Sequence, residues 1–281
     1  MNYVIIGAGP AGVIAAEALR RIDSAASVKV IGDEPEAPYS RMAIPYCLID
    51  RVAEEGTHLR KTDGHFDDLN IEVINDRALS VSPIEGSLAL ESGTTVSYDR
   101  LLVATGSTPI SPPIEGMDLP GVHPCWTLAD YRNIAARADK GAKVVLMGAG
   151  FIGSIILEAL AARGVDLTVV ELENRMVPRM MNEASGGLIK RWCEQRGVRV
   201  LTSTRVDGIT GGDPLAVSLS NGETLTANLV ISATGVAPNT QFLQGSGVNI
   251  DQGILVNERL ESSCLLYTSP SPRDGILSRM P

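Results

Sequence analysis

The segment YVIIGAGPAGVIAAEALRRI, Tyr3–Ile22, decides the fold. It reads as a short apolar strand, the loop Gly7-Ala8-Gly9-Pro10-Ala11-Gly12, and a helix over Val13–Ile22. In such a loop the first glycine allows a tight turn, the second lets a pyrophosphate approach the backbone, and the third lets helix and strand pack closely. A second strand, Val28–Ile31, leads to Asp33 and Glu34, acids that suit a ribose hydroxyl. The segment therefore predicts a dinucleotide-binding unit with phosphates at the helix N-terminus.

The same layout returns in the segment KVVLMGAGFIGSIILEALAARG, Lys143–Gly164. A strand over Lys143–Met147 precedes the loop Gly148-Ala149-Gly150-Phe151-Ile152-Gly153, and a helix over Ser154–Arg163 ends at Gly164, a residue typical of a C-cap. The next strand, Leu167–Val170, ends at Glu171. A single glycine loop of this kind is weak evidence, but two copies in the same strand–loop–helix–strand context are strong evidence.

The duplication extends beyond the glycine loops. Ala104-Thr105-Gly106 follows a predicted strand, and Ala233-Thr234-Gly235 follows another. Short alternating strands with glycine turns precede each of them. Between the copies, residues 107–124 hold five prolines, which is typical of a connection and not of a central strand or helix. The chain is therefore predicted to be an α/β protein of two doubly wound, Rossmann-like units, each with a small β-meander, that binds two dinucleotides.

Composition narrows the function classes. The 281 residues are 44% hydrophobic, enough for a sizeable core, and 33 acids outnumber 24 bases for a net charge of −9. Because nucleic-acid binding needs a basic face, we expect no nucleic-acid partner. No stretch reaches the roughly 18 apolar residues of a membrane helix, and the start lacks a basic signal region, so we expect no membrane and a cytoplasmic setting. Four cysteines without a C-x-x-C pair and three scattered histidines predict no metal site.

The ordered motifs GAGPAG, YDRLLVATGSTP, GAGFIG, VVE and ATGVAPN resemble the FAD/NAD(P)-dependent pyridine nucleotide-disulfide oxidoreductase family. This family includes ferredoxin and rubredoxin reductases, NADH oxidases and the flavin portion of nitrite reductases. The resemblance covers residues 1–263 and implies that an NAD(P)-binding domain is inserted into an FAD-binding domain. On that pattern we expect residues 1–113 and 240–263 to form an incomplete FAD domain and residues 114–239 the NAD(P) domain.

The resemblance also assigns cofactor contacts. It implies that the first glycine loop and Glu34 hold FAD and that the second holds NAD. A carboxylate at Glu171 suits the free 2′-hydroxyl of NADH and repels the 2′-phosphate of NADPH, so NADH is favoured, with Arg175 the one nearby cation that opposes this. The predicted cofactor-binding residues are Gly7, Ala8, Gly9, Pro10, Ala11, Gly12, Asp33, Glu34, Arg41, Tyr46, Ala104, Thr105, Gly106, Gly148, Gly150, Phe151, Ile152, Gly153, Glu171 and Gly235.

The segment PYSRMAIPYC, Pro38–Cys47, resembles the flavin-facing run of the ferredoxin reductases. Arg41 matches an arginine of that run and suits FAD phosphate oxygens. The lysine of the run falls on Tyr46, and the redox cysteine of the single-cysteine branch falls on Met42, which cannot form a thiolate. Cys47 is expected to be a packed thiol. We therefore name no catalytic residue and expect no chemistry through a protein thiol.

The function implied by the resemblance is an FAD-dependent oxidoreductase. It would take hydride from NADH to the flavin and pass electrons to an unidentified acceptor, a small molecule or a redox protein. Two alternatives stay open. One is the flavin electron-input module of a nitrite-reductase-like system. The other is a non-catalytic NADH-binding flavoprotein, which the altered positions Met42, Tyr46 and Ile155 (where the family often has a glutamate) keep open.

The end of the chain, CLLYTSPSPRDGILSRMP, differs in character from the rest. Residues 264–274 resemble the translation of a transposase sequencing adapter, and residues 278–281 resemble its constant flank beyond a short index. We expect residues 264–281 to be a non-native tail. Family members continue into a further strand and a G-D motif that contacts FAD. We therefore expect the first sheet to lack one strand and this chain to bind FAD weakly or not at all.

This interpretation predicts that genomic DNA encodes a different continuation after Ser263. Amplification and re-sequencing of the locus from genomic DNA measures it directly. Recovery of the same codons for residues 264–281 would contradict the adapter interpretation.

Overall fold

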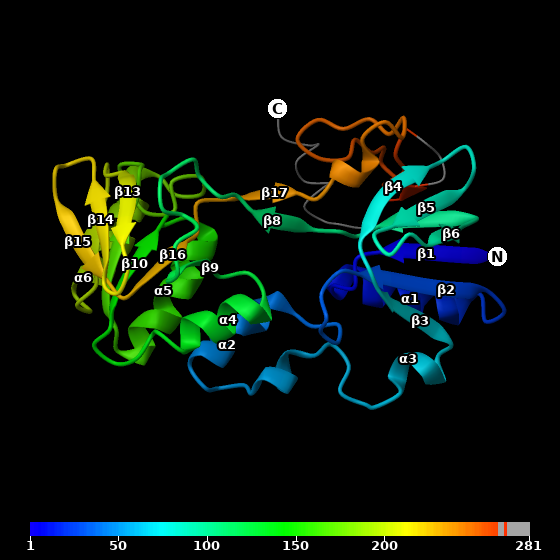
Figure 1. Cartoon of the computed structure of the whole chain (residues 1–281), viewed down its shortest axis with the longest axis horizontal. Helices are drawn as coiled ribbons and strands as arrows, with labels where there is room; N and C mark the ends of the chain where they lie inside the picture. The colour runs from blue at the N-terminus through cyan, green and yellow to red at the C-terminus, as the bar shows by residue number, and fades with distance from the viewer. Residues whose placement is uncertain (264–266, 269–281) are drawn as a thin grey trace. The chain divides into compact units, whose positions relative to one another are not determined.

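The computed structural model describes residues 1–263 and 267–268, and the chain forms two compact units. The first unit comprises residues 1–40, 58–108 and the described residues from Pro238 onward; the second comprises residues 41–57 and 109–237. Each unit is built on a five-stranded sheet (Figure 1). This confirms the predicted α/β class with two doubly wound units. The domain boundaries expected from the family stay a prediction.

The sheet of the first unit has the strand order β18-β7-β1-β2-β3, and every neighbouring pair is parallel. Tyr267–Thr268 forms β18 beside β7, at the edge that we expected to lack a strand. Residues 264–266 and 269–281, the rest of the predicted tail, lie outside the described residues. The elements are β1 (Asn2–Ile6), α1 (Pro10–Ile22), β2 (Ser27–Gly32), α3 (His65–Asp68), β3 (Ile71–Asn75), β7 (Arg100–Val103), η3 (Gln241–Leu243) and β18 (Tyr267–Thr268).

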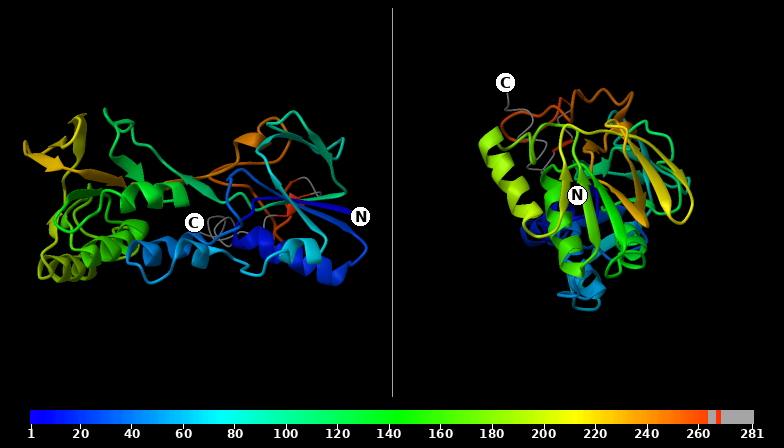
Figure 2. Two further views of the ribbon diagram at one scale, coloured as in Figure 1. Left: turned by 60° about the horizontal axis from the view of Figure 1, so that its bottom comes forward. Right: turned by 90° about the vertical axis from the view of Figure 1, so that its left-hand side faces the viewer.

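Alternation along β1 builds two cores in the first unit. Ile5 packs with Ala16 of α1 on one face of the sheet, whereas Val4 and Ile6 pack on the other face against a three-stranded meander. Helix α1 and the meander therefore cover opposite faces (Figures 1 and 2). The meander strands are β4 (Ala78–Ser82), β5 (Ser87–Leu90) and β6 (Thr95–Ser97).

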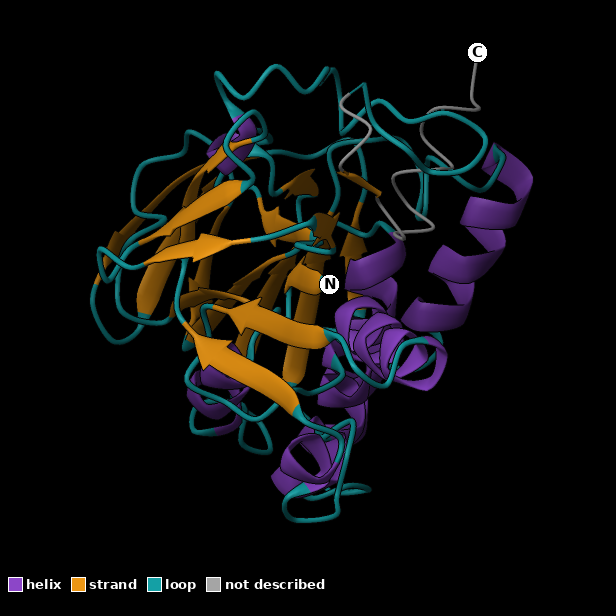
Figure 3. Cartoon of the chain, turned by 90° about the vertical axis from the view of Figure 1, so that its right-hand side faces the viewer, coloured by secondary structure: helices purple, strands orange, loops and turns teal. Residues whose placement is uncertain are grey.

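The second unit repeats this arrangement with the strand order β12-β11-β10-β16-β9, again all parallel. Its meander packs on Val145 and Met147 of the central strand. Strands and helices are distinguished by colour in Figure 3. The elements are β9 (Val122–Pro124), α4 (Leu128–Ala135), β10 (Lys143–Met147), α5 (Phe151–Arg163), β11 (Asp166–Val170), α6 (Glu183–Glu194), β12 (Arg199–Leu201), β13 (Val206–Gly211), β14 (Leu215–Leu219), β15 (Thr224–Ala227) and β16 (Leu229–Ser232).

The chain passes between the units through β8 (Ser107–Pro109) and β17 (Val236–Pro238), which form a two-stranded sheet. The predicted connection over residues 107–124 thus contains β8 and β9, and Pro124 closes the short edge strand β9. Gly164 ends α5 with φ +77°, which confirms the predicted C-cap.

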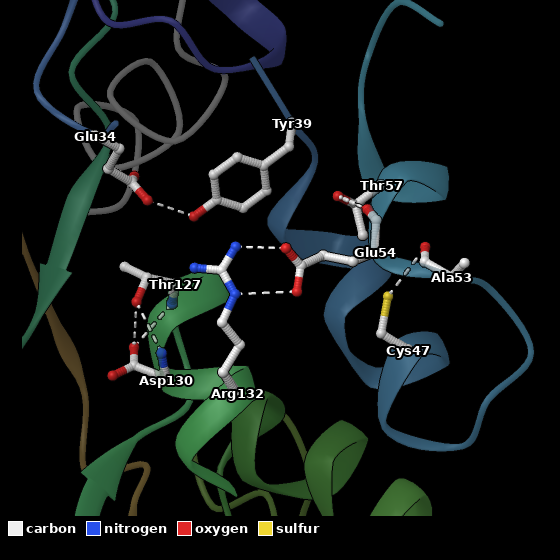
Figure 4. A network of polar contacts seen from close by, with 9 residues as sticks. All are labelled: Glu34, Tyr39, Cys47, Ala53, Glu54, Thr57, Thr127, Asp130 and Arg132. Atoms are coloured by element: carbon white, nitrogen blue, oxygen red, sulfur yellow. Dashed lines mark hydrogen bonds and ion pairs between the residues drawn. The ribbon is translucent and has the colours of Figure 1, made fainter. Parts of the chain in front are cut away.

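Residues 41–57 group with the second unit. They form η1 (Arg41–Ala43), α2 (Ile44–Leu48) and η2 (Glu54–Thr57). The Arg163 guanidinium, at the end of α5, donates to the carbonyl oxygens of Leu48 (2.6 Å), Ala138 (2.8 Å) and Ala135 (3.2 Å). These carbonyls lie at or near the C-termini of α2 and α4, where a cation is favourable. A second link is the Arg132–Glu54 ion pair (Figure 4).

Replacement of Arg163 by leucine should destabilise the second unit by about 2 kcal/mol, because three backbone carbonyls lose a charged donor. Both tryptophans, Trp126 and Trp192, lie in this unit, so urea unfolding followed by tryptophan fluorescence reports on it alone. Arg179→Leu, at an exposed site, is the matched control and should change the unfolding free energy by no more than about 0.5 kcal/mol. Equal unfolding midpoints for the two variants would contradict the role of Arg163.

Candidate dinucleotide sites

The glycine loop of the first unit is shaped by contacts that exclude side chains. Gly7 has φ +116°, and a Cβ there would lie 2.1 Å from the carbonyl oxygen of Ala104. A Cβ on Gly12 would lie 1.9 Å from the carbonyl oxygen of Gly7. By contrast, a Cβ on Gly9 would meet nothing within 4 Å. The middle glycine therefore faces open space, while the outer two hold the backbone in close contact.

The loop of the second unit has the same three-part geometry. Gly148 has φ +93°, and its Cβ would lie 2.6 Å from the carbonyl oxygen of Ala233. A Cβ on Gly153 would lie 2.1 Å from the carbonyl oxygen of Gly148, and one on Gly150 would meet nothing within 4 Å. The duplication recognised in the sequence is thus also a duplication of backbone packing.

Each loop leads directly into a helix N-terminus. Gly9 is the N-cap of α1, which begins at Pro10, and Gly150 is the N-cap of α5, which begins at Phe151. Neither helix has an acid in its first turn. Unpaired N–H groups and the partial positive charge of the helix suit a phosphate there. Both loops therefore fit a dinucleotide pyrophosphate.

The other loop residues are placed as follows. Pro10 and Phe151 are exposed, Phe151 with 51% of its surface accessible, whereas Ala8, Ala11 and Ile152 are half-buried. The helices begin three residues earlier than the sequence predicts. The reason is that the third glycine, expected in the loop, lies inside the first helical turn.

The acids after β2 have different partners. Glu34 Oε2 accepts a hydrogen bond of 2.5 Å from the hydroxyl of the buried Tyr39, and exposed Asp33 forms a 3.4 Å ion pair with Arg77 (Figure 4 shows the first pair). Tyr39 was not among the predicted site residues. Its phenol bonds to the Glu34 carboxylate, and its place in the segment Pro38–Cys47, five residues after Glu34, was the signal of this role in the sequence.

The acid after β11 is buried and bound to the backbone. Glu171 Oε2 accepts from Ala149 N at 2.6 Å, and Oε1 accepts from Glu173 N at 2.9 Å. Arg175, the cation that opposes the NADH assignment, donates to the carbonyl oxygens of Met181 and Pro178 and to the Asn174 side chain. These hydrogen bonds of the Arg175 guanidinium therefore lie within its own loop, residues 174–181.

The two alanine-threonine-glycine turns lie where the strands beside β1 and β10 end. Thr105 Oγ1 donates to the carbonyl oxygen of Asn239 at 2.8 Å, and Asn239 Nδ2 donates back to the carbonyl oxygen of Thr105 at 2.9 Å. Gly106 has φ +63° and Gly235 has φ +136°, so both turns need glycine. Ala104 pairs through its N–H with the carbonyl of Ile6. Asn239, whose backbone and side chain bond to the first of these turns, was missed as a site residue.

The segment predicted to face the flavin, Pro38–Cys47, begins in the first unit, and from Arg41 onward it belongs to the second. The Arg41 guanidinium lies 5.3 Å from the ring centroid of Trp126, a cation–π contact. Tyr46 and Met42 are exposed, with 51% and 61% of their surfaces accessible. The structure thus joins Arg41 and Tyr46 to the compact unit that carries Gly148–Gly153, Glu171 and Gly235.

The cysteines of residues 1–263 are buried thiols. Burial, with smaller effects of the Glu54, Asp50 and Glu55 carboxylates, raises the pKa of Cys47. Burial raises the pKa of Cys125 to about 12 and also raises the pKa of Cys193. Cys47 Sγ lies 3.7 Å from the carbonyl oxygen of Ala53 (Figure 4). A raised pKa keeps a thiol protonated and unreactive, in line with the expected packed role of Cys47.

In the part of the chain that the structure describes, no group of three or more histidine, cysteine or acidic side chains is arranged to hold a metal ion. No helix there combines the length and the apolar character that crossing a bilayer requires.

Two parallel sheets, each with a glycine loop at a helix N-terminus, define an α/β protein with paired dinucleotide-binding folds. The chain belongs to the pyridine nucleotide-disulphide oxidoreductase family, whose model matches residues 1–265. The resemblance stated from the sequence motifs is thereby confirmed.

Relatives of known name support this membership. The chain is 31% identical to the NADH-dependent phenylglyoxylate dehydrogenase subunit epsilon of Aromatoleum evansii, over 93% of this chain and 62% of the relative. It is 30% identical to an NADH oxidase of Methanocaldococcus jannaschii, over 94% of this chain and 61% of the relative. An NAD-dependent persulfide reductase from A. fulgidus superimposes with a TM-score of 0.90 at 31% identity, over 96% of this chain and 52% of that structure. The chain thus spans about three fifths of the length of the first two relatives and about half of the third.

The loop geometry predicts opposite outcomes for two alanine substitutions in one loop. Gly153→Ala should destabilise the second unit by about 2–3 kcal/mol, because its methyl group collides with the Gly148 carbonyl. Gly150→Ala should leave stability within about 1 kcal/mol, because φ −72° suits alanine and its methyl group enters open space.

The methyl group of Gly150→Ala would occupy the space expected for the pyrophosphate, so it should weaken NADH binding at least about tenfold. Urea unfolding and calorimetric titration measure the two effects. A Gly150→Ala variant that binds NADH like the wild type would contradict the site.

Proposed function

We propose that this chain is the dinucleotide-binding portion of an FAD-dependent oxidoreductase that takes electrons from NADH and passes them to an acceptor. The observation that carries the proposal is the repeated loop geometry, in which only the middle glycine faces open space. One such loop supports a single dinucleotide; two in one chain support the pair FAD and NADH. Because the chain spans about three fifths of its named relatives, this activity is proposed for the whole protein.

The residues present fit both coenzymes. Gly7, Gly9 and Gly12 would hold the FAD pyrophosphate, and Glu34, steadied by Tyr39, would accept from the FAD ribose. When bound, FAD supplies the hydride-accepting and electron-transferring chemistry. The protein contributes binding and orientation, so no side chain is required as an acid or base.

The second loop fits NADH better than NADPH. Gly148, Gly150 and Gly153 would hold its pyrophosphate. A 2′-phosphate would meet the Glu171 and Glu173 carboxylates, and the guanidinium of Arg175 donates to its own loop. Two relatives carry NADH in their names, which supports the same choice.

The acceptor is proposed to be a redox protein or a small molecule and not a protein disulfide. Met42 stands at the family's redox-cysteine position, and the nearby Cys47 is a buried thiol with a raised pKa. Relatives named rhodocoxin reductase and rubredoxin-NAD(+) reductase support a redox protein.

Calorimetric titration of the purified chain should give a dissociation constant for NADH at least about tenfold below that for NADPH, since a 2′-phosphate near two carboxylates is repelled. Gly150→Ala serves as the control and should weaken binding of both coenzymes. Equal affinities would contradict the preference, and binding of neither coenzyme would contradict the proposed function.

An assay of NADH oxidation distinguishes the proposed oxidoreductase from a non-catalytic NADH-binding flavoprotein. With excess FAD present, oxidation of NADH by ferricyanide supports the oxidoreductase. Tight NADH binding by a flavin-loaded protein without turnover supports the binding protein.

A further inference from the structure

The acids that follow β2 in the first unit and β11 in the second do not occupy equivalent positions. In the first unit Ile6 pairs with Ile31, and in the second Met147 pairs with Val170. The next residues along are Gly32 and Glu171. Glu171 therefore corresponds in register to a glycine, and Glu34 lies two residues further on. A Cβ on Gly32 would lie 2.7 Å from Ala8 Cβ, so the first unit has no room for a side chain there.

Each oxygen of the Glu171 carboxylate is bound by a backbone N–H group. Its two oxygens accept from Ala149 N (2.6 Å) and Glu173 N (2.9 Å), and the residue is 7% exposed. Its own backbone N–H donates to Leu201, and its carbonyl accepts from Thr204. The buried carboxylate thus bonds directly to Ala149, in the middle of the glycine loop.

The peptide groups of Ala149 are held from both sides. Its N–H donates to Glu171, and its carbonyl accepts from Val177 N at 2.8 Å. Val177 has φ +50°, an unfavourable conformation for a β-branched residue, which the surrounding contacts must maintain. Ala149 lies between Gly148 and Gly150, where the backbone would otherwise have the greatest conformational freedom. These bonds therefore order the part of the loop that a pyrophosphate approaches.

We propose that Glu171 is a positioning residue that orders the pyrophosphate loop of the second unit through the N–H of Ala149. This effect does not depend on any contact with a ribose 2′-hydroxyl. The inference rests on the proposed function, because it presumes that the loop binds a coenzyme pyrophosphate. It adds that the Glu171 side chain changes the affinity of the loop for phosphates. The first unit has no such side chain, because glycine (Gly32) stands at the equivalent position.

Whether Glu171→Gln strengthens or weakens coenzyme binding distinguishes a positioning role from a purely electrostatic one. Glu171→Gln removes a negative charge near a polyanion, and Coulomb's law alone predicts tighter binding. Glutamine has only one side-chain acceptor oxygen, so one of the two backbone N–H groups would lose its partner. Positioning therefore predicts weaker binding. Glu171→Asp keeps the charge but withdraws the carboxylate by one methylene group, so it should weaken binding as well.

The test uses the whole chain labelled with [15N]alanine. The amide of Ala149 reports on the second loop and that of Ala8 on the first, each assigned by its serine variant. ADP and 2′-deoxy-ADP are the probes, and each dissociation constant is read from the shift at Ala149. Asp166→Asn, an exposed acid at the opposite end of β11, is the matched loss of charge.

We expect Glu171→Gln to weaken binding of 2′-deoxy-ADP and ADP at Ala149 by the same factor, about tenfold. The response of Ala8 and the behaviour of Asp166→Asn should match the wild type. Glu171→Asp gives a second reading should the glutamine variant fail to fold.

Unchanged or tighter 2′-deoxy-ADP binding in a folded Glu171 variant would overturn the inference. If ADP alone were weakened, Glu171 would be a ribose acceptor only. Failure of the proposed function looks different: neither probe would then move the Ala149 resonance of the wild-type chain.

Discussion

The structure depends on backbone-to-backbone contact between the start of a helix and the ends of two strands. In each unit the carbonyl oxygen of the first glycine of the loop fills the space that a Cβ on the third glycine would need. The carbonyl oxygen of the alanine after the neighbouring strand, Ala104 or Ala233, fills the space that a Cβ on the first glycine would need. A single methyl group at either position would separate helix from sheet. Because these contacts leave the middle glycine uncovered, the packing that holds the fold also creates a surface for an anion.

Outside this shared frame, the two units differ. In the first, the acid after β2 is steadied by the phenol of Tyr39, a side chain from the loop beyond it. In the second, the acid lies two register positions earlier and binds the backbone of the glycine loop itself. Gly32 stands in the first unit at the register position that Glu171 holds in the second, and a Cβ on Gly32 would lie 2.7 Å from the Ala8 side chain. The two glycine loops therefore share the same backbone packing, whereas the acids that follow β2 and β11 have different hydrogen-bond partners.

Much of the fold could be predicted from local sequence, because apolar strands bounded by glycine are local signals. The strand over Lys143–Met147 was predicted to the residue, and both meanders were expected from their turns. Helix starts were placed late, since Gly12 and Gly153 resemble loop residues although they lie in the first turn. The roles of Asn239 and Glu171 depend on contacts with segments distant in sequence, which residue spacing does not specify. The role of Tyr39 depends on a local contact in a loop, where no strand or helix period marks which side chain meets Glu34.

The grouping of residues 41–57 with the second unit has a practical consequence for dissecting the protein. Ile44 and Leu48 of α2 are buried, and the α2 carbonyl of Leu48 is a partner of Arg163. A clone that begins at Pro109 and ends at Ala237 would omit them and expose apolar surface on that unit. An excised coenzyme domain would therefore need this early helix supplied in trans or grafted through a linker, even though some fifty residues of the other unit separate it in sequence.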